Sequence, residues 1–202
     1  VYTDNNFETD VKGLYVIGEA AGTFGLSRPG GSALNDTQVS SLVASEHIAE
    51  NVKNIPPVTF VKSRYEDISE KFITDETVDY SYIPEKMSEC CSFIRDEEKC
   101  RKLLSEIETL LENYPVKHKD IESFFRDRDM LISARALLGA IIAEMPETGS
   151  RGGAIFVSEG KRVTEDVSYR EYLTVTDGND VYFEKTRTVP ETDRPFEYYL
   201  KG

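Results

Sequence analysis

The stretch Gly13–Leu34 constrains the fold of this 202-residue chain more than any other part of the sequence. Leu14–Ile17 is a continuous apolar run between two glycines, which predicts a short strand buried on both faces of a parallel sheet. A loop with glycines at positions 22, 25, 30 and 31 follows, and a helix is expected to begin near Ser32 or Ala33. The sequence therefore predicts the order strand, glycine loop, helix, which places ligands at the carboxyl end of the strand.

Glu19 comes directly after the predicted strand and is the first candidate for binding a ligand. A carboxylate in that position can accept hydrogen bonds from the hydroxyl groups of a sugar alcohol. The alternative is a glutamate in a solvated turn. The loop does not contain the spacing GxGxxG, so the stretch is not a dinucleotide-binding fingerprint.

The predicted helix after the loop and the arginine within the loop favour a negatively charged ligand. The N–H groups and the positive dipole end of the helix point back towards the glycines. Arg28 can hold a carboxylate through two parallel hydrogen bonds, although an arginine in a surface ion pair is the alternative. We expect the apolar positions of this helix to form its buried face: Val39, Leu42, Val43, Ala49 and Val52.

The stretch Asn6–Ile48 resembles the C-terminal FAD-binding segment of the fumarate reductase, succinate dehydrogenase and L-aspartate oxidase flavoproteins. The matching features are Thr9, the apolar strand, the Gly18-Glu19 pair and the arginine before a small-residue helix start. The resemblance implies that Glu19 binds the ribityl chain of FAD and that Arg28 binds a carboxylate of the substrate. It implies that the backbone of Ala33 and Leu34 meets the pyrimidine edge of the flavin. The cofactor-binding residues that it implies are Gly18, Glu19, Gly31, Ser32, Ala33 and Leu34.

Two departures from the family pattern bear on the substrate. Phe24 stands where the family often has a histidine, and Ser27-Arg28-Pro29 stands where the dicarboxylate enzymes have Asn-Arg-Leu. The flavin assignment survives both changes, whereas succinate and fumarate become only one option for the substrate.

The whole chain is expected to have an α+β fold in four parts. The resemblance implies that residues 1–57 are the C-terminal segment of a Rossmann-like FAD-binding domain. Residues 58–84 are expected to be an irregular, acidic linker or wrapping segment. Residues 85–149 form an antiparallel helical bundle with helices over 85–94, 97–114 and 120–145. Residues 150–202 form a β-rich tail with a strand at 154–158, a hairpin at 172–186 and packed aromatic residues near the end.

Arg151, in Ser150-Arg151-Gly152, follows the last predicted helix. Three interpretations stay open for it: a cap of that helix, a link between the helical and flavin domains, or a surface cation.

Composition narrows the remaining function classes. The net charge of −13 argues against nucleic acids and anionic membrane surfaces, and no apolar run is long enough to span a membrane. The three cysteines (90, 91 and 100) are expected to be reduced and structural, consistent with the cytoplasm. His118 is expected to be exposed between two lysines, and neither histidine belongs to a metal set, so no metal site is predicted.

These observations predict the C-terminal portion of an FAD-dependent oxidoreductase that moves a hydride between flavin and a carboxylate-bearing substrate. No catalytic acid or base is expected in this chain, which alone is expected to be inactive and not to retain FAD. The expected partners are a small carboxylate, the N-terminal FAD and substrate domains of the same polypeptide, an electron-transfer subunit or domain, and a second copy in a homodimer. The alternative is a non-catalytic helical interaction module with a degenerate flavin loop.

Overall fold

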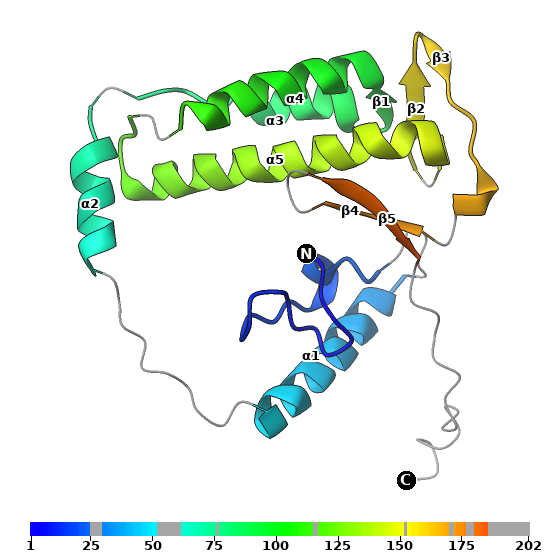
Figure 1. Ribbon diagram of the computed structural model, residues 1–202, viewed down its shortest axis with the longest axis horizontal. Coiled ribbons are helices and arrows are strands. Elements are labelled where there is room, and N and C mark those ends of the chain that lie inside the picture. Colours follow the sequence, from blue (N-terminus) through cyan, green and yellow to red (C-terminus); the bar gives the residue numbers. More distant parts are fainter. Residues whose placement is uncertain are drawn as a thin grey trace. The chain divides into compact units, whose positions relative to one another are not determined.

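The computed structural model describes residues 1–24, 30–51, 62–75, 77–114, 117–151, 153–169, 172–176 and 180–185. Its helices are α1 (Ser32–Asn51), α2 (Lys62–Phe72), α3 (Ile83–Cys91), α4 (Glu97–Glu112) and α5 (Ile121–Thr148), with 3-10 turns η1 (Gly18–Ala21) and η2 (Val167–Tyr169) (Figure 1). Its strands are β1 (Ile94–Asp96), β2 (Ile155–Ser158), β3 (Lys161–Arg162), β4 (Tyr172–Thr176) and β5 (Val181–Lys185). The chain is therefore α+β, as the sequence predicts.

Two compact units divide the chain. The N-terminal unit contains Val1–Tyr82, Asn113–Asp129 and Gly152–Ala154, and the helical unit contains Ile83–Glu112, Met130–Arg151 and Ile155–Gly202. Helix α5 contributes its first residues to the N-terminal unit and the remainder to the helical unit.

The prediction of a strand at Leu14–Ile17 is wrong. These residues form only an isolated antiparallel bridge between Tyr15 and Glu8, and Leu14 and Ile17 are 49% and 37% exposed. A strand buried on both faces needs neighbouring strands on each side, and the described residues provide none beside it. The segment instead folds back on itself, with Thr9 N–H donating to the Leu14 carbonyl at 2.9 Å and Val16 N–H donating to the Phe7 carbonyl at 3.0 Å.

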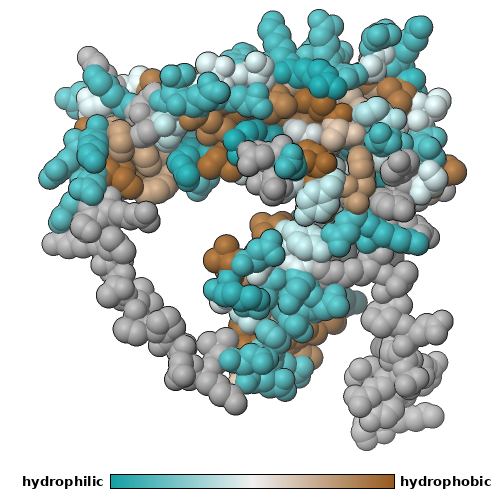
Figure 2. Space-filling view, viewed as in Figure 1, coloured by the Kyte–Doolittle hydropathy of each residue, from teal (hydrophilic) through white to brown (hydrophobic). Residues whose placement is uncertain are grey.

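Helix α1 begins at Ser32, as predicted, but its buried face is not the predicted one. Val39 and Leu42 are 60% and 57% exposed, whereas Ser40 and Ala44 are buried. Exposed hydrophobic and hydrophilic residues both occur on the surface of this unit (Figure 2). The helix therefore packs within this chain through small and polar side chains.

The linker prediction for 58–84 is wrong over Lys62–Phe72, which is helix α2. Phe72 at the end of this helix stacks on Phe124, with ring centroids 5.6 Å apart, and Tyr80 is buried. The segment has many charged residues, and these obscure its apolar pattern in the sequence. Ile68 and Phe72 are four residues apart, on one face of the helix, and both are half-buried.

His118 is buried, which corrects the expectation of an exposed histidine. Its backbone N–H donates to the Phe72 carbonyl at 2.8 Å, and its backbone carbonyl accepts from Thr74 N–H at 2.7 Å. The adjacent Lys117 and Lys119 are exposed. The two lysines thus face water while the residue between them faces the unit's interior.

The helical unit confirms the predicted antiparallel packing of α3 and α4. Lys86 Nζ contacts Glu106 Oε2 at 2.7 Å, and Cys100 Sγ donates to the Cys90 carbonyl at 3.2 Å, so residues near one end of α3 meet the facing end of α4. Among the described residues of this unit, the buried apolar side chains are those of Ile83, Cys90, Cys100, Leu103, Ile107, Leu131, Ala134, Leu138, Ile141, Ile142, Met145 and Phe156. Helix α3 ends at Cys91, earlier than predicted, because Ile94 begins strand β1.

Small sheets complete the helical unit. Strand β2 pairs in parallel with β1 and antiparallel with β3, and β4 pairs antiparallel with β5 from Tyr172↔Lys185 to Thr176↔Val181. These strands confirm the predicted strand at 154–158 and the predicted hairpin. The hairpin turn at 177–179 and the aromatic residues Phe196, Tyr198 and Tyr199 lie outside the described residues.

Helix α5 continues through Pro146 to Thr148, three residues beyond its predicted end. Pro146 removes one backbone hydrogen bond and crowds the carbonyl four residues before it, and the helix ends two residues later. The backbone turns at Gly149 (φ +65°), and Arg151 then folds back to pair with Glu144, with Nη2 and Oε1 2.6 Å apart. Of the three interpretations of Arg151, the surface cation is wrong, because Arg151 is 7% exposed and pairs with a side chain of the preceding helix.

Candidate functional site

Gly18 and Glu19 open the short turn η1, which lies against α1. Gly18 is buried with φ of +64°, and its N–H donates to Ser40 Oγ at 3.3 Å. A Cβ atom on residue 18 would lie 3.1 Å from Thr37 Oγ1. Glycine is therefore required here both by the backbone conformation and by the close approach to the helix. Glu19 follows with its side chain exposed to solvent.

The N-terminus of α1 presents backbone groups with few obstacles. Gly31 has φ of +84°, and a Cβ on Gly30 or Gly31 would meet no described atom within 4 Å. The first turn of α1 contains no acidic residue, and the Ala33 N–H has no hydrogen-bond acceptor among the described residues. A helix end of this kind attracts negative charge.

The other predicted residues of the helix start differ in exposure. Ser32 and Ala33 are half-buried, and Leu34 is 71% exposed, with its N–H donating to the Gly31 carbonyl at 3.2 Å. The predicted cofactor-binding residues thus occupy two neighbouring features of one unit, η1 and the start of α1. Arg28, the predicted substrate-binding residue, lies outside the described residues.

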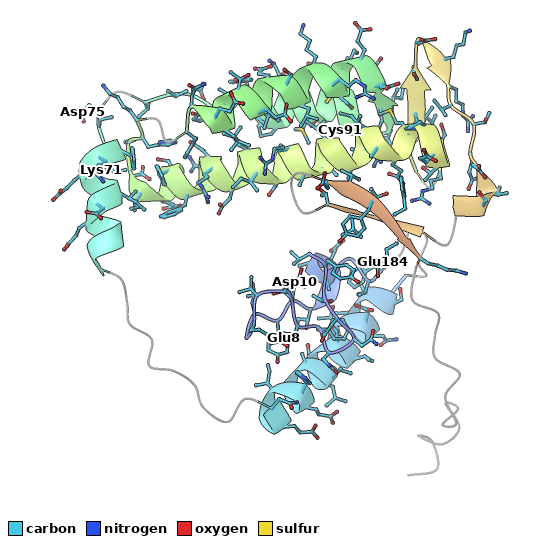
Figure 3. All side chains as sticks on the ribbon, in the orientation of Figure 1. Glu8, Asp10, Lys71, Asp75, Cys91 and Glu184 are labelled. Atoms are coloured by element: carbon cyan, nitrogen blue, oxygen red, sulfur yellow. The ribbon has the colours of Figure 1, made fainter. Side chains whose placement is uncertain are left out.

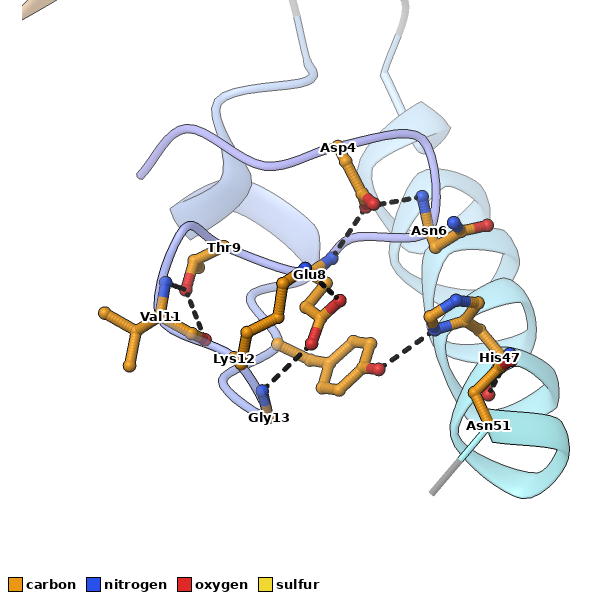
Figure 4. Close-up of polar contacts among 10 residues, drawn as sticks. Asp4, Asn6, Glu8, Thr9, Val11, Lys12, Gly13, His47 and Asn51 are labelled. Carbon is orange, nitrogen blue, oxygen red and sulfur yellow. Dashed lines mark hydrogen bonds and ion pairs between the residues drawn. The ribbon is translucent and has the colours of Figure 1, made fainter. Parts of the chain in front are cut away.

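Polar side chains that the sequence analysis did not assign to the site connect η1 and the residues on either side of it to α1. Besides Ser40, Asp36 accepts a hydrogen bond from Thr23 Oγ1 at 2.8 Å. His47 Nδ1 lies 2.9 Å from the Tyr15 hydroxyl (Figure 4). The signal that could have revealed them is the spacing of Asp36, Ser40 and His47, which places all three on one stripe of the helix.

The segment before η1 is held by local charge and turn hydrogen bonds. Glu8 accepts from Gly13 N–H at 2.9 Å and pairs with Lys12 at 3.1 Å, and these two partners lower the pKa of Glu8 (Figure 4). Thr9, part of the family pattern, is buried, and its Oγ1 accepts from Val11 N–H at 3.1 Å. Thr9 therefore shapes the turn that leads into Tyr15.

The three cysteines all lie in the helical unit. All three cysteines are free, and burial raises the pKa values of Cys91 and Cys100 to about 12; Figure 3 shows Cys91 at the end of α3. Within the described residues, no group of three histidine, cysteine, aspartate or glutamate side chains could hold a metal ion. None of the helices in the described part of the chain is both long and apolar enough to cross a bilayer.

Comparison with known proteins identifies similar chains of greater length. The sequence is 27% identical to an uncharacterized FAD-dependent oxidoreductase of Methanocaldococcus jannaschii, over an alignment of 180 residues that covers 77% of this chain and 33% of that protein. The chain therefore spans about a third of the length of the curated relative that it matches. No protein-family model matches the sequence.

The fold is similar to part of the quinol-fumarate reductases. A quinol-fumarate reductase solved with menaquinol molecules matches 95% of this chain and 37% of its own, with a TM-score of 0.70 and 21% identity. The FrdA chain of a mutant E. coli quinol fumarate reductase matches the same shares with a TM-score of 0.62 and 22% identity. The resemblance that the sequence motif predicts is confirmed over nearly the whole chain, with a distant FAD-dependent oxidoreductase as a relative.

Proposed function

We propose that this chain supplies one side of the FAD site of a longer flavin-dependent oxidoreductase. The observation that carries the proposal is the close packing of the Gly18-Glu19 turn against a helix whose start is free of acidic side chains. The match of nearly the whole chain to about a third of the related proteins supports it further.

The described residues fit a flavin in their donor chemistry. The exposed Glu19 carboxylate can accept hydrogen bonds from the ribityl hydroxyls, and the Ala33 N–H can donate to an electron-rich edge of the ring. Gly31 and Ser32 surround that helix start, while Gly18 fixes the turn that bears Glu19. When bound, FAD would accept or donate the hydride of the reaction. The protein groups named here hold the cofactor and favour negative charge at its edge.

Arg28 is the residue that we propose for binding a substrate carboxylate. In the sequence it follows η1 and precedes the start of α1, the two features that would hold FAD. A guanidinium group fixes the orientation of a carboxylate through two hydrogen bonds. The substrate is therefore a small carboxylate, and the catalytic acid or base belongs to the remainder of the polypeptide.

FAD titration followed by flavin fluorescence tests the cofactor assignment. The longer polypeptide containing these residues should bind FAD, and this chain alone should not, because it covers too little of the cofactor. Glu19→Ala in the longer polypeptide should raise the Kd about tenfold, the loss expected for hydrogen bonds to a charged group. Glu46→Ala, an exposed glutamate on α1, is the matched control and should leave the Kd unchanged.

Two outcomes would contradict the proposal. Equal FAD affinity of the isolated chain and the longer polypeptide would mean that the site is not shared. A longer polypeptide that does not bind FAD would favour the alternative in which the chain is a helical interaction module.

Reoxidation of the reduced flavin by a panel of small unsaturated carboxylates, whose carbon–carbon double bond can accept the hydride, tests Arg28. Arg28→Ala should lower kcat/KM by about a hundredfold for the best carboxylate, because a two-point ion pair is lost. The exposed Arg162 on β3 provides the control, and Arg162→Ala should have the wild-type rate. Equal rates for both variants would exclude Arg28 from substrate binding.

A further inference from the structure

Three polar contacts join the segment Tyr15–Thr23 to helix α1. Tyr15 Oη lies 2.9 Å from His47 Nδ1, Gly18 N–H donates to Ser40 Oγ at 3.3 Å, and Thr23 Oγ1 donates to Asp36 at 2.8 Å. As the residue number rises along the segment, the partner's number falls along the helix. The segment therefore runs antiparallel to α1.

The three helix residues form one stripe. Asp36, Ser40 and His47 are separated by four and seven residues, the spacing that places side chains on the same face of a helix. Ser40 is completely buried in this stripe, and Ala44, four residues further on, is buried as well. We call these three contacts the polar seam.

Apolar packing between the segment and the helix is limited. Leu14 and Ile17, on either side of the seam residue Tyr15, are exposed, and so are Val39 and Leu42 on the helix, whereas Val16 and Val43 are half-buried. The Gly18–Ser40 bond is long for an N–H···O hydrogen bond. The outer contacts of the seam therefore contribute to the orientation of η1 against α1.

The Tyr15–His47 contact joins two side chains that can each donate or accept a hydrogen bond. Burial and the nearby charges of Glu8 and Asp4 raise the pKa of the Tyr15 hydroxyl. The direction of the hydrogen bond between that hydroxyl and Nδ1 follows from the tautomer of His47. Figure 4 shows this contact between the N-terminal segment and His47 on α1.

We infer that Tyr15 and His47 are positioning residues that set the distance between Glu19 and the start of α1, and thereby the affinity and redox potential of the bound flavin. The inference rests on the proposed function, in which the turn that bears Glu19 and the start of α1 bind the same FAD. Neither residue needs to contact FAD. Tyr15 lies four residues before Glu19, and His47 lies near the opposite end of α1 from Ser32.

The test compares variants of the longer polypeptide in FAD titrations and in measurements of the flavin midpoint potential. Tyr15→Phe and His47→Leu should each raise the Kd about fivefold and shift the potential, as expected for one lost hydrogen bond. The double variant should be no worse than either single variant, because both remove the same contact. His47→Asn, which can place an oxygen near the position of Nδ1, should restore the wild-type values.

Ser45→Ala on the exposed side of α1 is the control and should match the wild type. Additive effects of the two single variants, or wild-type values for both, would overturn the inference while leaving the proposed function intact.

Failure of the wild-type polypeptide to bind FAD would instead overturn the proposed function and, with it, the role of the pair in cofactor binding. Hydrogen exchange in the isolated chain would then still decide whether the contact positions the turn. His47→Leu should speed exchange of the amides of residues 18–22, and unchanged exchange would show that the pair positions nothing.

Discussion

At Gly18 the backbone φ is +64°, and an added Cβ would lie 3.1 Å from the Thr37 side chain. At Gly30, by contrast, an added Cβ would meet no described atom within 4 Å. The two glycines belong to the same sequence motif, yet only the first is required by its surroundings in the described chain. Residue-scale predictions can therefore separate glycines that support the fold from those that leave space for a ligand.

Gly18→Ala should lower the free energy of unfolding of the N-terminal unit by about 1–2 kcal/mol, because alanine is strained at positive φ. Gly30→Ala should change it by less than about 0.5 kcal/mol. Urea unfolding of the two variants of this chain measures the difference. Equal stability of the two variants would mean that η1 is not packed against α1 as described.

Burial raises the pKa of the Cys100 thiol from 9.0 to about 12. Because the folded-state pKa lies above the unfolded value, the neutral thiol contributes stability that is complete below pH 9 and is lost as the pH rises towards 12. The drop in the urea midpoint between pH 8 and pH 11 should therefore be larger for the wild type than for Cys100→Ala. Parallel changes in the two proteins would show that this thiol does not titrate with a raised pKa.

At the scale of elements, the sequence predicted those with strong local patterns. The helices at 97–114 and 120–145 and the hairpin at 172–186 were recognised because apolar spacing and turn residues agree there. The predictions of a strand at Leu14–Ile17 and of the apolar face of α1 are wrong. An apolar run shows only that burial of those side chains is favourable, and not which partner buries them. In this chain the three contacts of the polar seam join the segment Tyr15–Thr23 to α1 instead.

In the candidate site, too, the residues in local sequence patterns could be predicted and those in long-range contacts could not. Gly18, Glu19 and the start of α1 could be placed from the order of glycines, carboxylate and helix, and the structure brings η1 and α1 together. His47 and Tyr15 could not be recognised, because their contact spans 32 residues and neither belongs to a local pattern. The prediction that His118 is exposed is wrong because it rests on the two charged neighbours, Lys117 and Lys119, which indicate exposure only for themselves.

Arg151 returns onto α5, where it forms a largely buried ion pair with Glu144. Arg151 and Glu144 are 7% and 14% exposed, and Arg95 on β1 lies only 4.0 Å from the same carboxylate. Arg151→Ala should lower the free energy of unfolding by about 3 kcal/mol, because it removes the main partner of a buried charge.

Arg101→Ala provides the matched control, since Arg101 pairs with Glu97 on the surface of α4 and is 58% exposed. This change should cost no more than about 0.5 kcal/mol. Chemical denaturation of both variants measures the contrast, and similar losses would mean that the Arg151 pair is solvated.

At the scale of the whole molecule, the described structure combines a helical unit with a self-contained core and an N-terminal unit whose apolar residues are often exposed. Leu14, Leu34, Val39 and Leu42 are all between 49% and 71% exposed. The related proteins are about three times as long as this chain. Both facts support the proposal that other parts of a longer polypeptide complete the packing of this unit and an FAD site.

Hydrogen–deuterium exchange of the longer polypeptide with and without FAD tests this account most directly. FAD should slow amide exchange in residues 18–22 and 30–36, which contain η1 and the start of α1, and should leave the α3–α4 pair unchanged. Protection confined to other segments, while FAD is demonstrably bound, would contradict the claim that this chain supplies one side of the flavin site.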